Sequence, residues 1–562
     1  MDKDHFQKLE VKIDAFLHCG DWASAVFWAE QLVLCNEDDA YAIYTFARCL
    51  FMAGEYGRAL LYLERRQLIE GHELFRFLAA QCKLARHLPG EVISLLQHVS
   101  ENSPKTKICR QKARSNLKRL SVLDELAINL NIAGQRSLLL GKALQMIEDT
   151  KEAVEAYKRA LQDDIMIADA ACRLFLDHFV KPSEKEEIFQ SIQSCMEMQN
   201  VVNPHLVHFF YALMLGRPPI DLQESVLSKY PSLEDSSLVC FQKARDLYSA
   251  GNFDSALDEL DKEVLTNEHD GRVLALRCCS LYLSGQEALL FRLAHELSLY
   301  MPDQAITYFA IGCYYFAVEG YDMAKQFFRK SAKIDSVSCY AWIAYGHACA
   351  SDLEHDQAMN SYLRASTLMQ GHPFPLTLIG VEYTITGHYA LAQSYLSEAL
   401  ELAPFNPYTV HEMGVLLLKM GKYRTAETYF VRALRLIGVE ERRVPIHWEP
   451  LVNNLGHCYR KMRMYDKALR QFEESLELVP CNPSTLISMA FVHMLMRDSW
   501  SAVRYLREAL SINPEDSVAK RLISRALENG SVTGFTFAVT ECESGSAVTS
   551  RELDHLLSCF EE

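Results

Sequence analysis

Two sets of residues have the types and spacing that metal or thiol chemistry uses. His205 and His208 are three residues apart, so both imidazoles would lie on one face of a helix. No third ligand type lies near them in the sequence, and we interpret them as packed or solvated histidines. Cys278 and Cys279 are adjacent and would point to different sides of a helix, so we interpret both as small core residues. The sequence therefore predicts no metal site.

Motifs for catalysis or cofactor binding are absent from the sequence. It contains no G-x-x-x-x-G-K-[ST], G-x-G-x-x-G, H-E-x-x-H or G-x-S-x-G pattern. None of the 17 cysteines forms a C-x-x-C pair, and no apolar leader begins the chain. We therefore expect no catalytic residues, no cofactor and no enzyme activity, with reduced thiols in the cytosol or nucleus.

Composition limits the classes of protein that remain. Gly and Pro together make up about 7% of the 562 residues, against roughly 12% in average proteins, which disfavours an all-β fold of this size. Hydrophobic residues at 49% and charged residues at 23% are values of a globular chain. A net charge of −16 argues against partners that are nucleic acids or anionic membranes. No apolar run approaches the roughly 20 residues of a membrane span.

Columns of small residues recur with a period of 34 residues, and this is the strongest pattern in the sequence. One column holds glycine, with a single longer step of 42 residues before its last member. Its glycines are Gly312, Gly346, Gly380, Gly414 and Gly456. A second column holds alanine, and its members are Ala324, Ala358, Ala392, Ala426, Ala468 and Ala502. Aromatic residues and closing prolines follow the same period.

These columns predict a stack of helix pairs. Each unit is two antiparallel helices, A and B, whose close approach only a small side chain permits, and large apolar residues between the columns fill the layer. A single unit cannot bury its apolar face, so stacking must supply the core. The pattern resembles the tetratricopeptide repeat (TPR). We expect an all-α, right-handed solenoid of about 13–14 such repeats.

The phase of the repeat divides the chain into segments. Three segments break the phase, namely the basic segment 101–133, the eight extra residues 441–448 and the tail after residue 529, and residues 134–236 keep the phase only weakly. The predicted segments are N-terminal repeats at 1–100, a basic, partly ordered loop at 101–133, degenerate repeats at 134–236, regular repeats at 237–516, a capping helix at 517–529 and a mobile tail at 530–562.

The A helices of a TPR solenoid line a concave channel, which predicts a site for an extended or helical peptide. The side chains at the channel positions combine apolar, aromatic, amide and basic groups. These positions hold Tyr340, His347, Thr377, Val381, Thr384, His411, Val415, Asn453, His457, Arg460 and Lys461. The same side chains could instead pack against the next turn of the superhelix, and the sequence leaves both interpretations open.

The basic segment at 101–133 also has two interpretations. Ser103-Pro104 is a minimal proline-directed phosphorylation site, and a phosphate at Ser103 would partly neutralise the neighbouring positive charge. A solvated loop without a regulatory role fits the composition equally well.

Certain strings resemble one TPR family more closely than the general repeat. They are Ser24–Ala29 (SAVFWA), 341–347 (AWIAYGH), 379–383 (IGVEY) and 448–457 (WEPLVNNLGH). They resemble the cell division cycle protein 16 family, also called subunit 6 of the anaphase-promoting complex or cyclosome. The resemblance runs from about residue 6 to residue 525.

The resemblance implies a non-catalytic scaffold subunit of a cullin-RING ubiquitin ligase that drives mitotic exit. It implies a homodimer joined through the N-terminal repeats, with residues 6–100 at the interface. It also implies that the C-terminal repeats enclose a peptide of a small accessory subunit of the cell division cycle protein 26 type. Other TPR and scaffold subunits of the complex are further expected partners, and the expected location is nucleus and cytoplasm.

Two alternatives belong to other functional classes. A stand-alone co-chaperone adaptor would clamp the acidic C-terminus of a chaperone, but Val381 and Val415 stand where that clamp needs an amide. The TPR arm of a glycosyltransferase would need a catalytic domain, which does not follow the repeats. Co-elution with ubiquitin-ligase activity at megadalton mass would favour the scaffold.

Overall fold

The computed structural model describes residues 3–97, 118–176, 179–198, 203–216, 220–249, 251–264, 271–437 and 444–534. The chain divides into two units. Unit 1 comprises residues 1–245 and 256–372, and unit 2 comprises residues 246–255 and 373–562. Ser103 and residues 535–562 of the predicted tail (530–562) lie outside the described residues, while residues 530–534 continue the helix that begins at Ser517.

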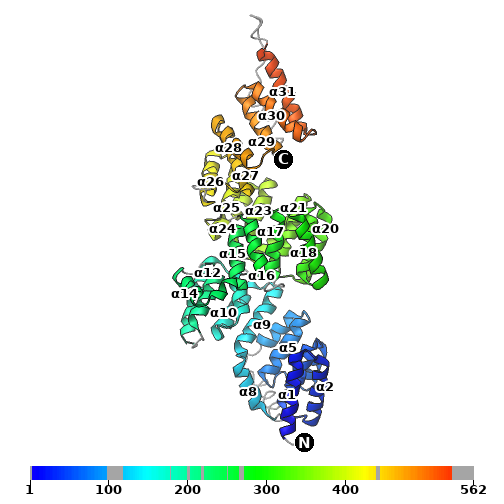
Figure 1. Cartoon of the computed structure of the whole chain (residues 1–562). Helices are drawn as coiled ribbons and strands as arrows, with labels where there is room; N and C mark the ends of the chain where they lie inside the picture. Colours follow the sequence, from blue (N-terminus) through cyan, green and yellow to red (C-terminus); the bar gives the residue numbers. More distant parts are fainter. Residues whose placement is uncertain are drawn as a thin grey trace. The chain divides into compact units, whose positions relative to one another are not determined.

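Helices account for nearly all of the described structure (Figure 1). The first half of the chain contains α1 (Lys3–Cys19), α2 (Trp22–Cys35), α3 (Ala40–Met52), α4 (Tyr56–Arg65), α5 (Glu73–Ala85), α6 (Pro89–Gln97), α8 (Leu120–Asn129), α9 (Ile132–Ile147), α10 (Thr150–Asp163), α11 (Ala168–Ala171), the π-helix η1 (Cys172–Leu176), α12 (Pro182–Met198), α13 (Pro204–Met214), α14 (Ile220–Lys229), η2 (Pro231–Asp235), α15 (Ser237–Ser249) and α16 (Phe253–Val264).

The second half of the chain is a regular succession of paired helices. It contains α17 (Gly271–Leu283), α18 (Glu287–Tyr300), α19 (Ala305–Ala317), α20 (Tyr321–Ile334), α21 (Cys339–Ser351), α22 (His355–Leu368), α23 (Pro373–Ile385), α24 (Tyr389–Leu402), α25 (Pro407–Lys419), α26 (Tyr423–Leu436), η3 (Ile446–Trp448), α27 (Glu449–Lys461), α28 (Tyr465–Leu478), α29 (Pro483–Leu495), α30 (Ser499–Ile512) and α31 (Ser517–Gly534).

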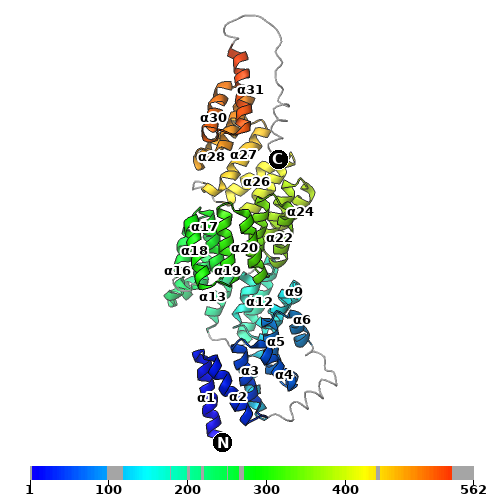
Figure 2. The ribbon, with the colours of Figure 1, turned by 90° about the vertical axis from the view of Figure 1, so that its right-hand side faces the viewer.

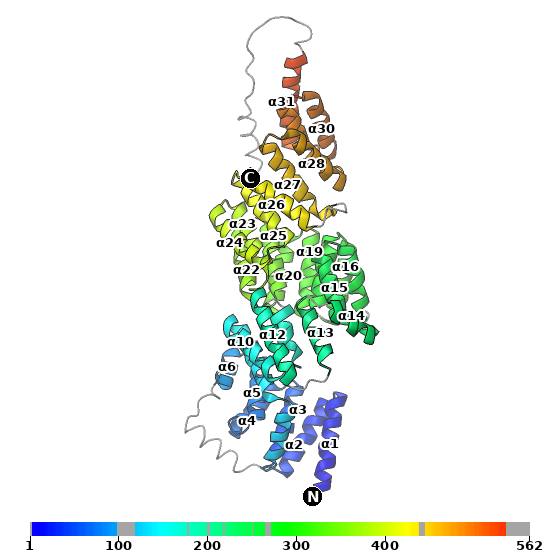
Figure 3. The same ribbon diagram turned by 90° about the vertical axis from the view of Figure 1, so that its left-hand side faces the viewer.

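Each pair is held by the small residues that the sequence repeats. A Cβ added to any glycine of the glycine column would lie under 3.0 Å from a side chain of helix B, such as Tyr362 opposite Gly346 and Leu396 opposite Gly380. All six alanines of the second column are fully buried. Only residues without a large side chain permit this approach, because protein interiors are close-packed. Figures 2 and 3 show the resulting pairs, such as α19 with α20 and α25 with α26.

The start of several A helices is determined by the local sequence. Asn406 caps α25 by accepting from the backbone N–H of Tyr408 at 3.0 Å, and Pro407 follows at the first helical position. Asn482 and Pro483 repeat this arrangement at α29. An asparagine cap followed by proline is a favourable helix start, since proline lacks the N–H that has no partner there.

The turn between helix A and helix B requires a left-handed residue in every regular repeat. From α17 onward this position is Gly285, Glu319, Leu353, Gly387, Gly421, Arg463 and Arg497, with φ between 59° and 80°. Glycine adopts this conformation at no steric cost, whereas other residues are strained in it. The turn geometry is thus retained even where the residue type does not favour it.

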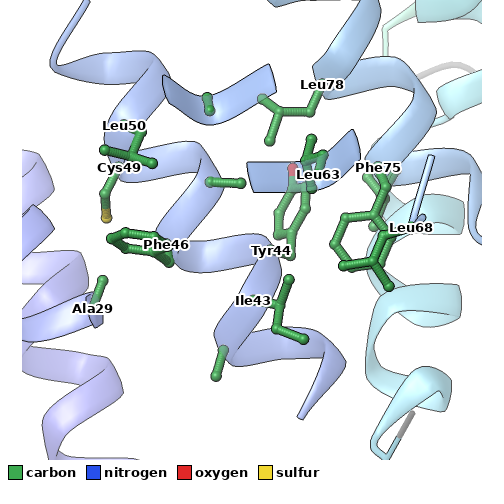
Figure 4. Close-up of a cluster of buried hydrophobic side chains, with 14 of the residues drawn as sticks. Ala29, Ile43, Tyr44, Phe46, Cys49, Leu50, Leu63, Leu68, Phe75 and Leu78 are labelled. Carbon is green, nitrogen blue, oxygen red and sulfur yellow. The ribbon is translucent and has the colours of Figure 1, made fainter. Parts of the chain in front are cut away.

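The apolar core runs between the layers of each unit. In the N-terminal repeats, Ala29 of α2, Ile43 and Phe46 of α3, Leu63 of α4 and Phe75 of α5 belong to one buried cluster (Figure 4). Corresponding clusters follow along the chain, so each layer is completed by its neighbour. The predicted all-α TPR architecture is confirmed by these helix pairs.

Unit 1 also closes on itself. The side-chain amide of Gln370 donates to Thr150 Oγ1 at 2.7 Å, and Arg364 pairs with the carboxylate of Glu148. Thr150 and Gln370 are 220 residues apart in the chain, which is roughly six and a half repeats of 34 residues. The turn after α9 therefore contacts the end of α22.

Candidate peptide-binding channel

Tyr340 and His347 are the channel positions of α21, and their surroundings differ. Tyr340 is 38% exposed and lies at the surface of a cavity. The ring of His347 is within 3.0 Å of the hydroxyl of Tyr362 on α22. Burial lowers the pKa of His347 to about 4, since a charged imidazole would lose its hydration. His347 is therefore a neutral residue that joins the two helices of its own repeat.

Thr377 and Thr384 on α23 are buried and bonded to the solenoid. Thr377 Oγ1 lies 3.0 Å from the carbonyl of Pro373 and 3.0 Å from Thr409 Oγ1 of the next A helix. Thr384 donates to the carbonyl of Gly380 at 2.7 Å. Both hydroxyls are satisfied within the chain, so neither is presented to a ligand.

His411 and Asn453 likewise join neighbouring elements of unit 2. His411 is 7% exposed, and its ring contacts Glu412 Oε1 and Asn454 Nδ2, each at 3.1 Å. Asn453 donates to Glu449 Oε1 at 3.2 Å and to Thr485 Oγ1 at 3.1 Å. The amide nitrogen of Asn453 is thus engaged between α27 and α29.

His457 and Arg460, two further members of the predicted set, also pack against neighbouring side chains. The ring of His457 lies edge-on to Phe472, with centroids 5.1 Å apart. Burial, followed by the charges of Arg460 and Lys461, lowers the pKa of His457 to about 3. Arg460 is 5% exposed and its guanidinium lies 5.2 Å from the centroid of the Phe491 ring. Lys461 is half-buried.

The side chains at the channel positions that are not fully buried are both polar and apolar: His347, Asn453, His457 and Lys461 are half-buried. Val381 of α23 and Val415 of α25 are half-buried, and Tyr340 is the most exposed residue of the predicted set. Most of the polar members contact other residues of the solenoid, as the second interpretation of the sequence predicts. Peptide binding at Tyr340 and the two valines stays a prediction.

Sequence reasoning missed a buried polar cluster in unit 2. The carboxylate of Glu449 is 8% exposed and accepts from the hydroxyl of Ser475 and the amide of Asn453. Thr485 lies 3.5 Å from the same carboxylate. These contacts connect α27, α28 and α29. The only signal in the sequence was the shared position of Thr409 and Thr485, each two residues after an Asn-Pro helix start.

A cavity of about 320 Å³ lies within unit 1. It is bounded by the segment around η1, which supplies Arg173 and Phe179, and by the A helices α17, α19 and α21, which supply Arg272, Phe309 and Tyr340 among others. The lining is mixed, because apolar side chains alternate with charged ones. A cavity of this size and composition suits one or two residues of a peptide.

One acid of the cavity is held ionised. Burial of Asp169 opposes its charge, but hydrogen bonds and charges from Lys142 and Arg173 outweigh burial and hold its pKa below the usual value. Arg173 also lies 3.4 Å from Gln145 Oε1, which accepts from the hydroxyl of Tyr157 at 2.8 Å. The polar side of the cavity is thus fixed by its own contacts.

The remaining candidates from the sequence are accounted for by packing. His208 stacks on Phe189 with ring centroids 5.3 Å apart, and burial followed by the charge of His205 lowers its pKa. Cys278 is fully buried, and burial raises the pKa of its thiol. Within the described ranges no group of three or more His, Cys, Asp or Glu is placed to hold a metal ion. Over the same ranges no helix has the length and apolarity to cross a membrane.

Models of known protein families match parts of the chain. The family model "Anaphase-promoting complex, cyclosome, subunit 3" matches residues 18–99. Tetratricopeptide-repeat models match residues 305–337, 376–406 and 451–480.

Similar proteins extend over most of the chain. The "Cell division cycle protein 16 homolog" of Homo sapiens is 29% identical over 529 residues, which covers 93% of this chain and 84% of the human protein. "Anaphase-promoting complex subunit cut9" of Schizosaccharomyces pombe is 27% identical and covers 89% and 72% of the two chains.

A solved structure agrees with these relatives. "Crystal structure of APC/C hetero-tetramer Cut9-Hcn1" superposes with a TM-score of 0.73 at 25% identity, covering 93% of this chain and 96% of that one. Sequence and fold agree over the same extent: over most of its length the chain is similar to the cell division cycle protein 16 proteins, subunit 6 of the anaphase-promoting complex, and it shares their TPR fold.

Proposed function

We propose that the protein is a non-catalytic scaffold subunit of an anaphase-promoting complex, a cullin-RING ubiquitin ligase of the cell cycle. In this role it forms a homodimer through residues 6–100 and holds a segment of a small accessory subunit in its C-terminal repeats. It contacts other TPR and scaffold subunits of the complex, and it works in nucleus and cytoplasm. The observation that carries the proposal is the continuous similarity to subunit 6 proteins over 93% of the chain.

Exposed apolar side chains on the first two helices support the dimer. Phe27 and Leu34 are seven residues apart on α2, so they share one face of the helix, and they are 54% and 60% exposed. Trp28 lies beside Phe27, and Val11 of α1 is 68% exposed. Large apolar side chains grouped at a surface are typical of protein interfaces. The solved relative Cut9 forms a hetero-tetramer with Hcn1.

The accessible channel residues support capture of a peptide. Val381 and Val415 occupy equivalent positions on α23 and α25, and together they provide an apolar strip in unit 2. A peptide side chain can pack on such a strip while its backbone bonds to nearby polar groups. This proposal assigns the binding energy to the valines, because His347, His411, the two threonines and the amide nitrogen of Asn453 are already hydrogen-bonded within the chain.

The assembly can be tested with the tagged chain in its own cells. Affinity purification with mass spectrometry should recover subunits of the anaphase-promoting complex, a second differently tagged copy of this chain and one small subunit. The chain should elute at megadalton mass in fractions that carry ubiquitin-ligase activity. Recovery of the chain alone, or only with chaperones, would contradict the proposal and favour the adaptor alternative.

A second experiment tests the channel. The double change Val381→Asp with Val415→Asp should abolish recovery of the small subunit, because two carboxylates would replace the apolar strip. Leu391→Asp is the matched control, since Leu391 lies on helix B of the α23 repeat and is 47% exposed. Equal recovery by the double variant and the control, at equal melting temperature, would exclude the valine strip as the binding surface.

A further inference from the structure

α8 is an additional helix that lies on the N-terminal repeats, between the repeat that ends with α6 and the one that begins with α9 (Figure 1). It packs against α3 and α5, the A helices of two successive repeats. Tyr41 is the second residue of α3, which is the offset that Tyr340 has in α21. The guanidinium of Arg119, just before α8, lies 5.2 Å from the centroid of the Tyr41 ring. The segment therefore covers positions that face the channel in other repeats.

Arg119 binds two buried carboxylates. Its Nη1 lies 2.6 Å from Glu10 Oε1 and 3.0 Å from Asp39 Oδ2, and its Nη2 lies 3.3 Å from Glu10 Oε2. Glu10 is 8% exposed and Asp39 4%. The pKa of Arg119 is raised by the hydrogen bond to Glu10, against the effect of burial. Asp39 also caps α3, because its other oxygen accepts from the backbone N–H of Tyr41 at 3.1 Å.

Asp124 of α8 makes the equivalent contact at the next A helix. His72 caps α5, and its Nδ1 accepts from the backbone N–H of Leu74 at 3.1 Å. Its Nε2 must then carry the proton, which it donates to Asp124 Oδ1 at 3.0 Å. His72 is 4% exposed, so the imidazole end of this hydrogen bond is shielded from water. The N-caps of α3 and α5 are thus both bound by one short segment.

Apolar and backbone contacts complete the match. Leu123 is fully buried in the N-terminal core, and Leu120 and Leu126 pack against the same cluster. The opposite face of the helix carries Ile128, which is 78% exposed. Before the helix, Lys118 N donates to Asp38 O at 2.8 Å, and Lys118 O accepts from Ala40 N at 3.1 Å. This is the manner in which an amphipathic helix docks in a groove, with charged groups that fix its position.

We propose that the N-terminal repeats carry a docking site for a short amphipathic helix, and that the chain fills this site with its own residues 118–127. The recognised pattern is an arginine, a leucine four residues later, an aspartate directly after it and a second leucine two residues further. A tethered ligand has an effective concentration on the order of millimolar, so it excludes an external helix of similar affinity. The N-terminal face is therefore closed to such partners until the internal helix is released.

The experiment uses the full-length chain and a fluorescent peptide of residues 118–131. In the variant Arg119→Ala with Leu123→Ala the internal helix is weakened, while Glu10, Asp39 and His72 remain in place. The peptide should bind this variant at least tenfold more tightly than it binds the wild-type chain. A peptide carrying the same two substitutions should not bind, and the control variant Ile128→Ala should behave as the wild type.

Two results would overturn the proposal. One is that the peptide fails to bind a double variant that keeps the helix content of the wild type. The second result does not depend on the folding of the double variant, because it is measured by hydrogen exchange of the wild-type chain. A displaceable helix opens locally, so the amides of α8 should exchange at least tenfold faster than those of α3 and α5. Equal protection would show that α8 is an integral part of the core.

Discussion

At the scale of single residues, the repeat is governed by volume. Gly346 lies where helix A meets helix B, and a Cβ there would fall inside contact distance of the Tyr362 ring. Tyr362 cannot withdraw, because it is 1% exposed and bonded to His347. The same geometry recurs at Gly380, where Leu396 takes the place of the tyrosine. The glycine column therefore records a steric requirement.

Gly346→Ala should lower the free energy of unfolding by about 1–3 kcal/mol, as overpacking of a full core does. Gly271→Ala is the matched control, since Gly271 is also in an A helix but has no atom within 4 Å of an added Cβ. The control should change stability by less than about 1 kcal/mol. Urea unfolding followed by circular dichroism compares the two. Equal effects would show that the close approach of Tyr362 is unimportant.

Buried histidines give the chain a defined response to acid. The pKa of His457 is about 3 in the folded chain, mainly through burial, whereas an unperturbed histidine has a pKa of about 6.5. Between about pH 3 and pH 6.5, His457 binds a proton in the unfolded chain but not in the folded chain. Stability must therefore fall as pH falls from 6.5 towards 3, by up to about 1.4 kcal/mol per pH unit for this group.

His457→Gln removes this contribution, so the stability of unit 2 should depend less on pH between 6.5 and 4. The measurement is the urea midpoint at several pH values, followed by tryptophan fluorescence, to which Trp448 contributes. His388→Gln provides the control, because His388 lies on an exposed turn. If the variant and the wild type lose stability in parallel, His457 is not the group responsible.

At the scale of elements, the sequence predicted the helix pairs because their requirements are periodic. Small residues, apolar stripes and Asn-Pro starts each fix one local feature, and together they place helices such as α25 and α29. The A-to-B turn could not be found in this way. Its left-handed residue is glycine at Gly387 but leucine at Leu353 and arginine at Arg463, so no residue type marks the position.

The turn position allows a reciprocal test. Leu353 has φ of 61° and is 78% exposed, so it carries backbone strain without useful packing. Leu353→Gly should raise the free energy of unfolding by about 0.5–1 kcal/mol, the strain released less the entropy that glycine costs. Gly387→Leu should do the opposite by about 1–2 kcal/mol, since its φ is 80°. The thermal midpoints of both variants measure these changes in stability. A loss of stability in Leu353→Gly would show that Leu353 is not strained in the wild-type chain.

The channel was less predictable than the fold for a physical reason. Offsets within a repeat say which positions face inward, but not whether an inward side chain already has a partner. Thr377 and Asn453 differ little in sequence terms from ligand-binding residues, yet each is bonded to the next repeat. α8 escaped prediction because its apolar residues follow a basic run that is typical of a loop.

At the scale of the whole molecule, a repeat array is expected to respond mainly through nearest neighbours. Unit 1 departs from this rule, because Arg364 and Gln370 at α22 contact Glu148 and Thr150 beside α10. Periodicity alone could not predict this closure, since the pitch of a superhelix is the sum of many small rotations. The contact makes two segments far apart in sequence neighbours in space.

Arg364→Ala should therefore raise hydrogen exchange in two places, α21–α22 and α9–α10. The pair of Arg364 and Glu148 is partly exposed, so its loss should cost about 0.5–1 kcal/mol, or roughly a two- to fivefold faster exchange in α9–α10. Arg292→Ala is the control, because Arg292 is 70% exposed and pairs with Glu296 one turn along the same helix. Faster exchange confined to α21–α22 would mean that the loss of Arg364 destabilises only the repeat in which it lies. A response in both segments would mean that unit 1 is stabilised as a closed turn, in which a change at one repeat is felt by another 220 residues away.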